Sequence, residues 1–160
     1  MISFVGIVYA CAMAPARSRT CPRDTSTTSC ENAPVSYTIF HAGELDWQYR
    51  REGDPRLVAT LSDALTQSRA NVFRYPPGAF GRRHIDPIQE EVFVVLDGTL
   101  TIHMGDGDEP EHHELAQGSV LVVQPGTALQ LSNRHEGELR LFIVGAPPER
   151  GEAVFLPTVE

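Results

Sequence analysis

Short runs of alternating apolar and polar residues, separated by turn residues, cover the chain from Val35 onward. Runs of this length that are rich in β-branched and aromatic residues predict β-strands. They fall at residues 35–41, 70–75, 91–96, 99–104, 119–123, 128–132 and 139–144. Asp97-Gly98 stands between two of these runs and is typical of a β-hairpin turn. The pattern predicts an all-β sandwich or small barrel.

Two segments depart from this alternation. Leu57, Leu61, Ala64 and Leu65 recur at helical spacing, so we expect one short helix among the strands. Residues 105–114 contain five acids in ten residues but lack the register of a calcium-binding loop. This segment predicts a solvated hairpin loop, and any strand there would point its two adjacent histidines to opposite faces.

The first 33 residues have a different composition. Residues 2–14 are apolar, but a membrane-spanning helix needs about 20 such residues. The run has the length of the apolar part of an export signal, yet no positive charge precedes it and Pro15 follows a candidate cleavage site. We therefore interpret residues 1–33 as a signal-like or disordered extension and residues 34–160 as the folded domain. We expect a cytoplasmic protein, exported only if residues 1–14 are a genuine signal segment.

Charge and cysteine content narrow the function further. The 160 residues carry 21 acids and 13 bases, a net charge of -8, and every base is an arginine. No basic patch or stripe of the kind that binds nucleic acid is visible. Cys11, Cys21 and Cys30 all lie in the N-terminal extension, so the folded part requires no disulfide and no cysteine-bound zinc.

Candidate chemistry concentrates in residues 78–98. His84 and Asp86 are two residues apart, so on a strand they project from the same face. Glu91 follows after a proline turn, at the head of an apolar strand. An imidazole and two carboxylates that converge inside a barrel are a plausible ligand set for Mn, Fe, Ni or Zn.

The spacing of these residues resembles the first motif of the cupins, specifically the single-domain type 2 class. That motif reads G-x5-H-x-H-x3–4-E-x6-G. Gly78, His84, Glu91 and Gly98 match it in order and spacing, with Asp86 in place of the second histidine. The resemblance implies a double-stranded β-helix, or jelly-roll, barrel.

The second cupin motif, G-x5-P-x-G-x2-H-x3-N, is matched less completely within residues 118–133. Gln124 occupies the proline position, with Pro125 one place later, and Leu129 occupies the histidine position. The positions that match are Gly118, Gly126 and Asn133. The resemblance as a whole covers about residues 69–145.

In metal-binding cupins the ligands are the two histidines and the glutamate of the first motif and the histidine of the second. Carried over to this chain, the resemblance implies a metal held by His84, Asp86 and Glu91, with no ligand from Leu129. His103 and His135 are the remaining imidazoles that could complete the set. Alternatively, His84 and Glu91 form a buried hydrogen-bonded pair that needs no ion.

Three hypotheses of different classes follow. The first is a cupin that binds a divalent metal weakly, a small molecule, or both, in which Glu91 serves as a general base if the barrel raises its pKa. The second is a metal-free barrel that binds a small-molecule ligand, which the loss of a histidine at position 129 favours. The third is a structural or dimer-forming module, since cupins often form homodimers. The residues expected to line the barrel are Phe93, Val95 and Leu129, with Arg82 as a contact for an anionic ligand at its mouth.

Overall fold

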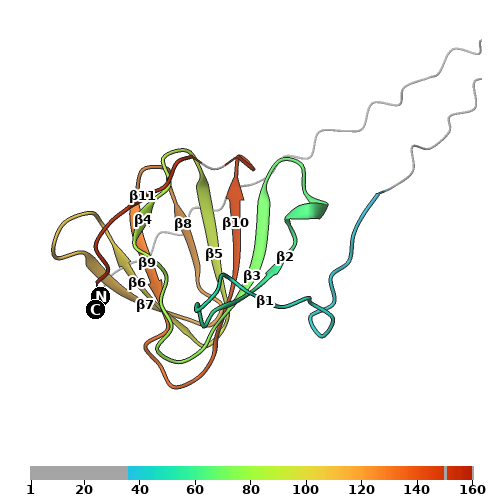
Figure 1. Ribbon diagram of the computed structural model, residues 1–160, viewed down its shortest axis with the longest axis horizontal. Coiled ribbons are helices and arrows are strands. Elements are labelled where there is room, and N and C mark those ends of the chain that lie inside the picture. The colour runs from blue at the N-terminus through green and yellow to red at the C-terminus, as the bar shows by residue number, and fades with distance from the viewer. Residues whose placement is uncertain (1–35, 150, 160) are drawn as a thin grey trace, which may run out of the picture. The chain divides into compact units, whose positions relative to one another are not determined.

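The computed structural model of the protein describes residues 36–149 and 151–159 (Figure 1). The extension predicted for residues 1–33, with all three cysteines, lies outside these residues. Within the part that is described, no helix is long and apolar enough to cross a bilayer.

Two antiparallel sheets face each other, so the predicted all-β jelly-roll architecture is confirmed (Figure 1). One sheet has the strand order β1-β2-β3-β10-β5-β8 and the other has the order β11-β4-β9-β6-β7. The first sheet consists of β1 (Gln48–Tyr49), β2 (Leu57–Thr60), β3 (Arg69–Tyr75), β10 (Leu139–Ala146), β5 (Glu90–Asp97) and β8 (Val120–Val123). The second consists of β11 (Val154–Phe155), β4 (His84–Ile85), β9 (Ala128–Ser132), β6 (Thr99–Met104) and β7 (Glu111–Ala116).

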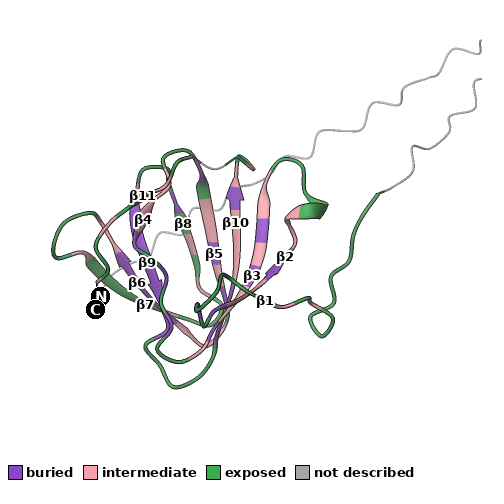
Figure 2. Cartoon of the chain, in the orientation of Figure 1, coloured by how far each residue is buried: buried purple, intermediate pink, exposed green. Residues whose placement is uncertain are grey.

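The hydrophobic core lies between the inner faces of the two sheets (Figure 2). Leu100 and Ile102 of β6 meet Leu139 and Leu141 of β10 there, and each is at most 1% exposed. Side chains of a strand alternate between its faces, so one set of positions in each strand fills this core. Burial of such aliphatic side chains stabilises the fold by about 1.5–3 kcal/mol each.

Six of the seven predicted strand runs coincide with observed strands, and the run at residues 35–41 does not. Residues 36–41 form no strand, and Tyr37 and Ile39 are 76% and 66% exposed. A strand becomes stable only by pairing with a neighbour and packing one face. This segment has no sheet partner among the described residues, so its alternating sequence does not form a strand.

The predicted helix is reduced to a single 3-10 turn at Ser62–Ala64. Its first part instead forms β2, which pairs with β3 from Leu57 opposite Arg74 to Thr60 opposite Asn71. Pairing with a neighbouring strand outweighs the weak helical period of the leucines. The segment at residues 105–114, predicted to be a loop, also contains a strand: its second part belongs to β7, which pairs with β6. His112 and His113 point to opposite faces of that strand, as predicted, opposite His103 and Ile102 respectively.

Asp97-Gly98 does not form the predicted hairpin, because β5 and β6 belong to different sheets. The chain crosses from one sheet to the other at this point. Gly98 has a positive φ of 78°, and a Cβ added there would lie 2.7 Å from the carbonyl oxygen of Glu138. The chain therefore does turn at Asp97-Gly98, as predicted. The turn packs closely against the loop before β10 and forms a corner of the barrel instead of a hairpin.

Candidate functional site

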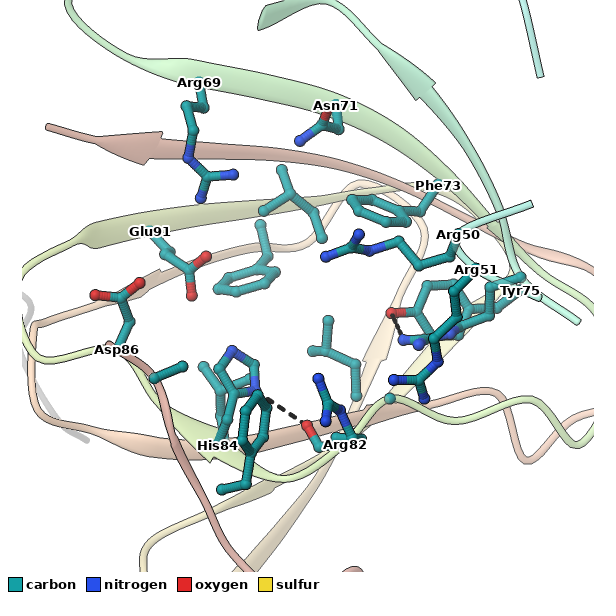
Figure 3. A pocket seen from close by; sticks show the side chains of 18 of the residues that line it. Arg50, Arg51, Arg69, Asn71, Phe73, Tyr75, Arg82, His84, Asp86 and Glu91 are labelled. Carbon is teal, nitrogen blue, oxygen red and sulfur yellow. Dashed lines mark hydrogen bonds between the residues drawn. The ribbon is translucent and has the colours of Figure 1, made fainter. Parts of the chain in front are cut away.

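A cavity of about 290 Å³ opens between the inner faces of the sheets (Figure 3). Its apolar walls come from both sheets: Phe73, Phe93, Leu129, Leu131 and Ile143. Its polar lining includes the residues of the predicted site together with several arginines. A mostly preformed concave pocket with a few convergent polar groups is the usual form of a small-molecule site.

His84 reaches the pocket from β4, a two-residue strand that pairs with β9 and β11. Its Nδ1 lies 3.0 Å from the carbonyl oxygen of Arg82. Because a carbonyl oxygen can only accept a hydrogen bond, Nδ1 of the neutral ring carries the proton. The other ring nitrogen, Nε2, is then the one able to accept a hydrogen bond or a metal.

Asp86 and Glu91 lie on the same side of the pocket as His84 (Figure 3). Oδ1 of Asp86 accepts hydrogen bonds from the backbone amides of Ile88 and Gln89, both at 3.0 Å. These bonds hold the carboxylate in a turn that leads into β5. Glu91 is half-buried near the start of β5, opposite Val123 on one side and Gly145 on the other.

The donor set of the pocket falls short of what a metal ion requires. No group of three His, Cys, Asp or Glu side chains in residues 36–149 and 151–159 is arranged to hold a metal. One carboxylate oxygen of Asp86 is already engaged, and Leu129 stands directly opposite His84 in the β4–β9 pair with no donor atom. The side chains therefore do not fit a metal as they stand, and His84, Asp86 and Glu91 as ligands remain a prediction.

The other predicted lining residues divide into two groups. Phe93, Leu129 and Arg82 line the pocket. Val95 does not line it and belongs instead to the core cluster, at 2% exposure. Val95 lies two residues after Phe93 in β5, so both side chains point inward. At Val95, however, aliphatic side chains fill the space between the two sheets.

Four arginines of the pocket were missed by the sequence analysis: Arg50, Arg51, Arg56 and Arg69. The first three flank the turn between β1 and β2, and no motif marks them. Arg69 and Asn71 carried a usable signal, because they alternate with Ala70 and Val72 in β3 and share a face with Phe73. Polar residues on the inward positions of a core strand indicate a cavity behind them.

A buried ion pair fixes the turn beside the pocket. Nε and Nη2 of Arg56 donate to the two carboxylate oxygens of Asp54 at 2.8 and 2.5 Å. Nη1 of Arg56 also donates to the hydroxyl of Tyr75 at 3.2 Å. The hydrogen bonds from Arg56 hold the pKa of Asp54 below its usual value, while burial raises the pKa of Tyr75. Asp54 is therefore charged, and Tyr75 is neutral, at physiological pH.

Comparison with known proteins identifies the domain. The sequence profile of the family described as the cupin domain matches residues 71–145, a range that includes both motifs, at residues 78–98 and 118–133. The domain is a cupin. No curated protein sequence matches the chain.

Solved structures share the cupin fold at low sequence identity. An uncharacterized conserved protein with a double-stranded β-helix domain from Klebsiella pneumoniae has a TM-score of 0.62 and 20% identity, covering 77% of this chain and 100% of its own. The polyketide cyclase RemF from Streptomyces resistomycificus has a TM-score of 0.66 and 18% identity, covering 78% and 89%. A sugar phosphate isomerase of the cupin superfamily from Silicibacter pomeroyi has a TM-score of 0.59 and 23% identity, covering 68% and 75%. Their activities differ, and what they share with this chain is the fold.

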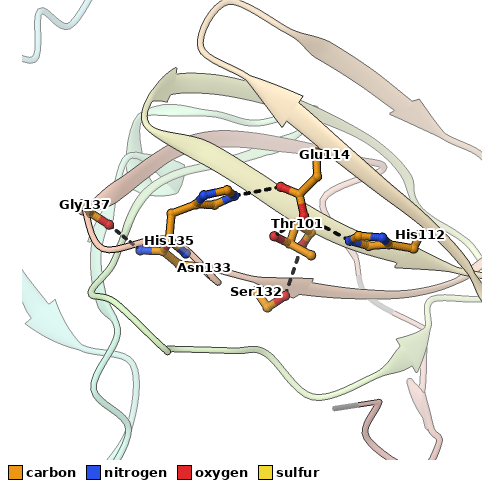
Figure 4. Close-up of polar contacts among 7 residues, drawn as sticks. All are labelled: Thr101, His112, Glu114, Ser132, Asn133, His135 and Gly137. Atoms are coloured by element: carbon orange, nitrogen blue, oxygen red, sulfur yellow. Dashed lines mark hydrogen bonds and ion pairs between the residues drawn. The ribbon is translucent and has the colours of Figure 1, made fainter.

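The two remaining histidines of the predicted site lie outside the cupin pocket, on the outer face of the second sheet. His135 Nε2 lies 2.8 Å from Oε2 of Glu114, and His112 Nε2 lies 3.0 Å from Oε1 (Figure 4). His103 stacks on His112 with a ring separation of 5.1 Å. Neither His103 nor His135 is therefore available to complete a ligand set with His84.

The buried ion pair generates a prediction about stability. Replacing Asp54 by Asn leaves the Arg56 charge buried without its partner, which we expect to cost about 3 kcal/mol at neutral pH. Because the pKa of Asp54 is lowered in the fold, its contribution is fully present above the unfolded pKa of about 3.9 and is lost as pH falls through the folded pKa. Urea denaturation at neutral and acid pH measures the difference.

The matched control is Asp46→Asn, which alters an exposed carboxylate that accepts a hydrogen bond from Gln48. We expect a change of about 0.5 kcal/mol or less for this variant. Equal losses of stability in the two variants at neutral pH would contradict the assignment.

Proposed function

We propose that this cupin binds a small molecule in the pocket between its sheets, through contacts that do not require a resident metal. The observation that carries the proposal is the lining itself, where apolar walls from both sheets enclose the convergent polar side chains of His84, Asp86, Glu91 and Arg82. The volume of about 290 Å³ is close to the lower end of the range of about 300–1,000 Å³ for ligand pockets. The ligand is accordingly a small metabolite-sized molecule.

His84 supports the proposal as a hydrogen-bond acceptor. Its Nδ1 proton is directed to the carbonyl oxygen of Arg82, so Nε2 can accept a hydrogen bond from a ligand hydroxyl or amine. The ring also lies beside Phe155, with centroids 6.4 Å apart. A general-base role for Glu91 remains a prediction that depends on finding a reaction.

Filling the pocket tests the proposal. Ala153 is half-buried in the pocket lining and lies outside the regular strands, so Ala153→Trp places an indole in the cavity without altering the core. We expect small-molecule screening by thermal shift, with organic acids, sugars and aromatic compounds, to identify ligands that stabilise the wild type. A ligand at about 100 times its Kd adds about 2.7 kcal/mol to the stability of the fold. Ala153→Trp should lose this response.

The neighbouring substitution Val154→Trp is the control, because Val154 is 52% exposed and is not part of the pocket lining. We expect it to respond to the same compounds as the wild type. A ligand that stabilises Ala153→Trp as strongly as the wild type binds elsewhere and refutes the proposal.

Metal content tests the second part of the proposal. The full chain, purified without a metal-affinity tag and incubated with Mn, Fe, Ni or Zn, should retain less than one equivalent by plasma mass spectrometry, because Leu129 supplies no ligand. Ligand-induced stabilisation should survive treatment with a chelator. One equivalent of metal in the wild type that is lost in His84→Ala would instead establish His84, Asp86 and Glu91 as a metal site.

We also propose that the protein forms a homodimer through the outer face of its larger sheet. Strand register places six apolar side chains on that face, which we call the outer valine face: Val92, Val94, Val120, Val122, Phe142 and Val144. Val120 and Val122, on the edge strand β8, are 61% and 58% exposed. Strands that are apolar on both faces are typical of sheets covered on both sides. A second copy, presenting the same face across a two-fold axis, would provide that cover.

Introducing charge on the outer valine face tests the dimer. The double substitution Val120→Glu and Val122→Glu should shift the protein from dimer to monomer in sedimentation velocity, because a dimer would bury unpaired carboxylates. Both side chains point away from the core, so circular dichroism should be unchanged. Phe80→Glu is the control, since Phe80 is 56% exposed and lies outside this face. A wild type that is monomeric at every concentration would overturn the proposal.

A further inference from the structure

We propose that the pocket recognises its ligand by an oxyanion, either a carboxylate or a phosphate, bound on the arginine side, with ligand hydroxyl groups directed to the His84 side. The inference rests on the proposed function, that the pocket binds a small molecule, and adds the chemical class of that molecule.

The pocket carries an excess of positive charge. Five arginines and two carboxylates line it, an excess of three positive charges with His84 neutral. Counting the nearby Asp54 still leaves an excess of two. The chain as a whole carries a net charge of -8, so positive charge is concentrated here against the overall sign. An excess of one sign of charge in a cleft raises the local concentration of ligands of the opposite sign.

Arg82 packs against an aromatic ring of the pocket. Its guanidinium lies over the ring of Phe155, 3.7 Å from the centroid. Among the described residues, no carboxylate forms an ion pair with it. Stacking holds the planar group in one orientation while leaving its N–H donors in the plane, where they can bind a carboxylate or phosphate.

Three more of the pocket arginines lie on the turn between β1 and β2. The Arg50 amide donates to the carbonyl oxygen of Arg56 at 3.0 Å, and the Asp54 amide donates to that of Arg51 at 3.1 Å. These bonds bring three arginines together on one turn, which also carries the carboxylates of Glu52 and Asp54. Asp54 uses both oxygens for Arg56, and Nε of Arg51 lies 3.4 Å from it. With three arginines and two carboxylates, the turn carries an excess of one positive charge.

The opposite side of the pocket sets the orientation of the ligand. Figure 3 shows Asp86 and Glu91 on one side of the cavity and Arg50 and Arg51 on the other. Carboxylates repel a ligand anion but accept hydrogen bonds from its hydroxyl groups. Nε2 of His84 accepts in the same way. Arg50 and Arg51 therefore favour the oxyanion of a ligand at their end of the cavity, with its hydroxyl groups toward Asp86 and Glu91.

Three probes that share a hydroxylated six-carbon frame test the inference: gluconate, glucose 6-phosphate and glucose. Isothermal titration calorimetry of the full chain, in the presence of a chelator, should show binding of at least one of the two anions. Glucose should bind at least about tenfold more weakly, because it lacks the charge-assisted hydrogen bonds. The comparison of gluconate with glucose 6-phosphate distinguishes the carboxylate from the phosphate. Added salt should weaken binding of the anion.

Variants assign the effect to particular side chains. Arg82→Gln and Arg51→Gln should each weaken anion binding about tenfold or more, whereas Arg82→Lys should lose less because it keeps the charge. Arg134→Gln is the matched control, since Arg134 is exposed and lies outside the pocket lining. It should bind as the wild type does.

The outcomes separate this inference from the proposed function. Equal affinity for the anions and glucose, abolished by Ala153→Trp, would overturn the oxyanion inference and leave small-molecule binding standing. Unchanged anion affinity in both arginine variants would overturn it as well. If neither anion binds, the inference fails, and the thermal-shift screen with Ala153→Trp then decides the proposed function independently.

Discussion

The packing of two inner sheet faces against each other is the constraint on which the rest of the structure depends. Along β5 and β10, inward positions near Val95 and Leu141 meet aliphatic side chains and close the core. Two residues further along the same strands, Phe93 and Ile143 form one wall of a cavity. At this end of the sheet the inward positions include charged side chains, Glu91 on β5 and Arg69 on β3. Charged groups cannot pack together as a dry core, and the pocket exists for this reason.

Alternation in the sequence was sufficient to predict most of the barrel, because burying one face of a strand imposes a period of two that side chains must follow. The alternation gave the wrong element where pairing with a distant strand determines the structure more strongly than the local sequence does. Residues 57–60 follow β3 into the sheet in spite of their helical spacing, and Asp97-Gly98 joins strands of different sheets. Both outcomes depend on contacts between segments far apart in the chain, which local patterns do not contain.

The site was predictable to a different extent on its two sides. His84, Asp86 and Glu91 lie within eight residues and follow a family spacing, so their arrival at one pocket could be anticipated from the sequence, although their joint use as metal ligands could not. The arginines come from the β1–β2 turn, from β3 and from the segment before β4. These arginines converge because the barrel closes. The only feature of the sequence that indicated this was the polar residues at inward positions of β3.

One wall of the pocket is held differently from the others. β11 contributes Phe155 to the lining but pairs with β4 over only two residues, and its side chains are half exposed. Beyond it, the amide of Leu156 donates to Arg83, and Val159 exchanges two hydrogen bonds with the buried amide of Gln130. The residues after β11 are thus held by hydrogen bonds, whereas β11 itself makes few. Local opening of β11 therefore costs less free energy than unfolding of the barrel. For a ligand seated against Phe155, the residence time would be governed by this C-terminal wall rather than by the core strands.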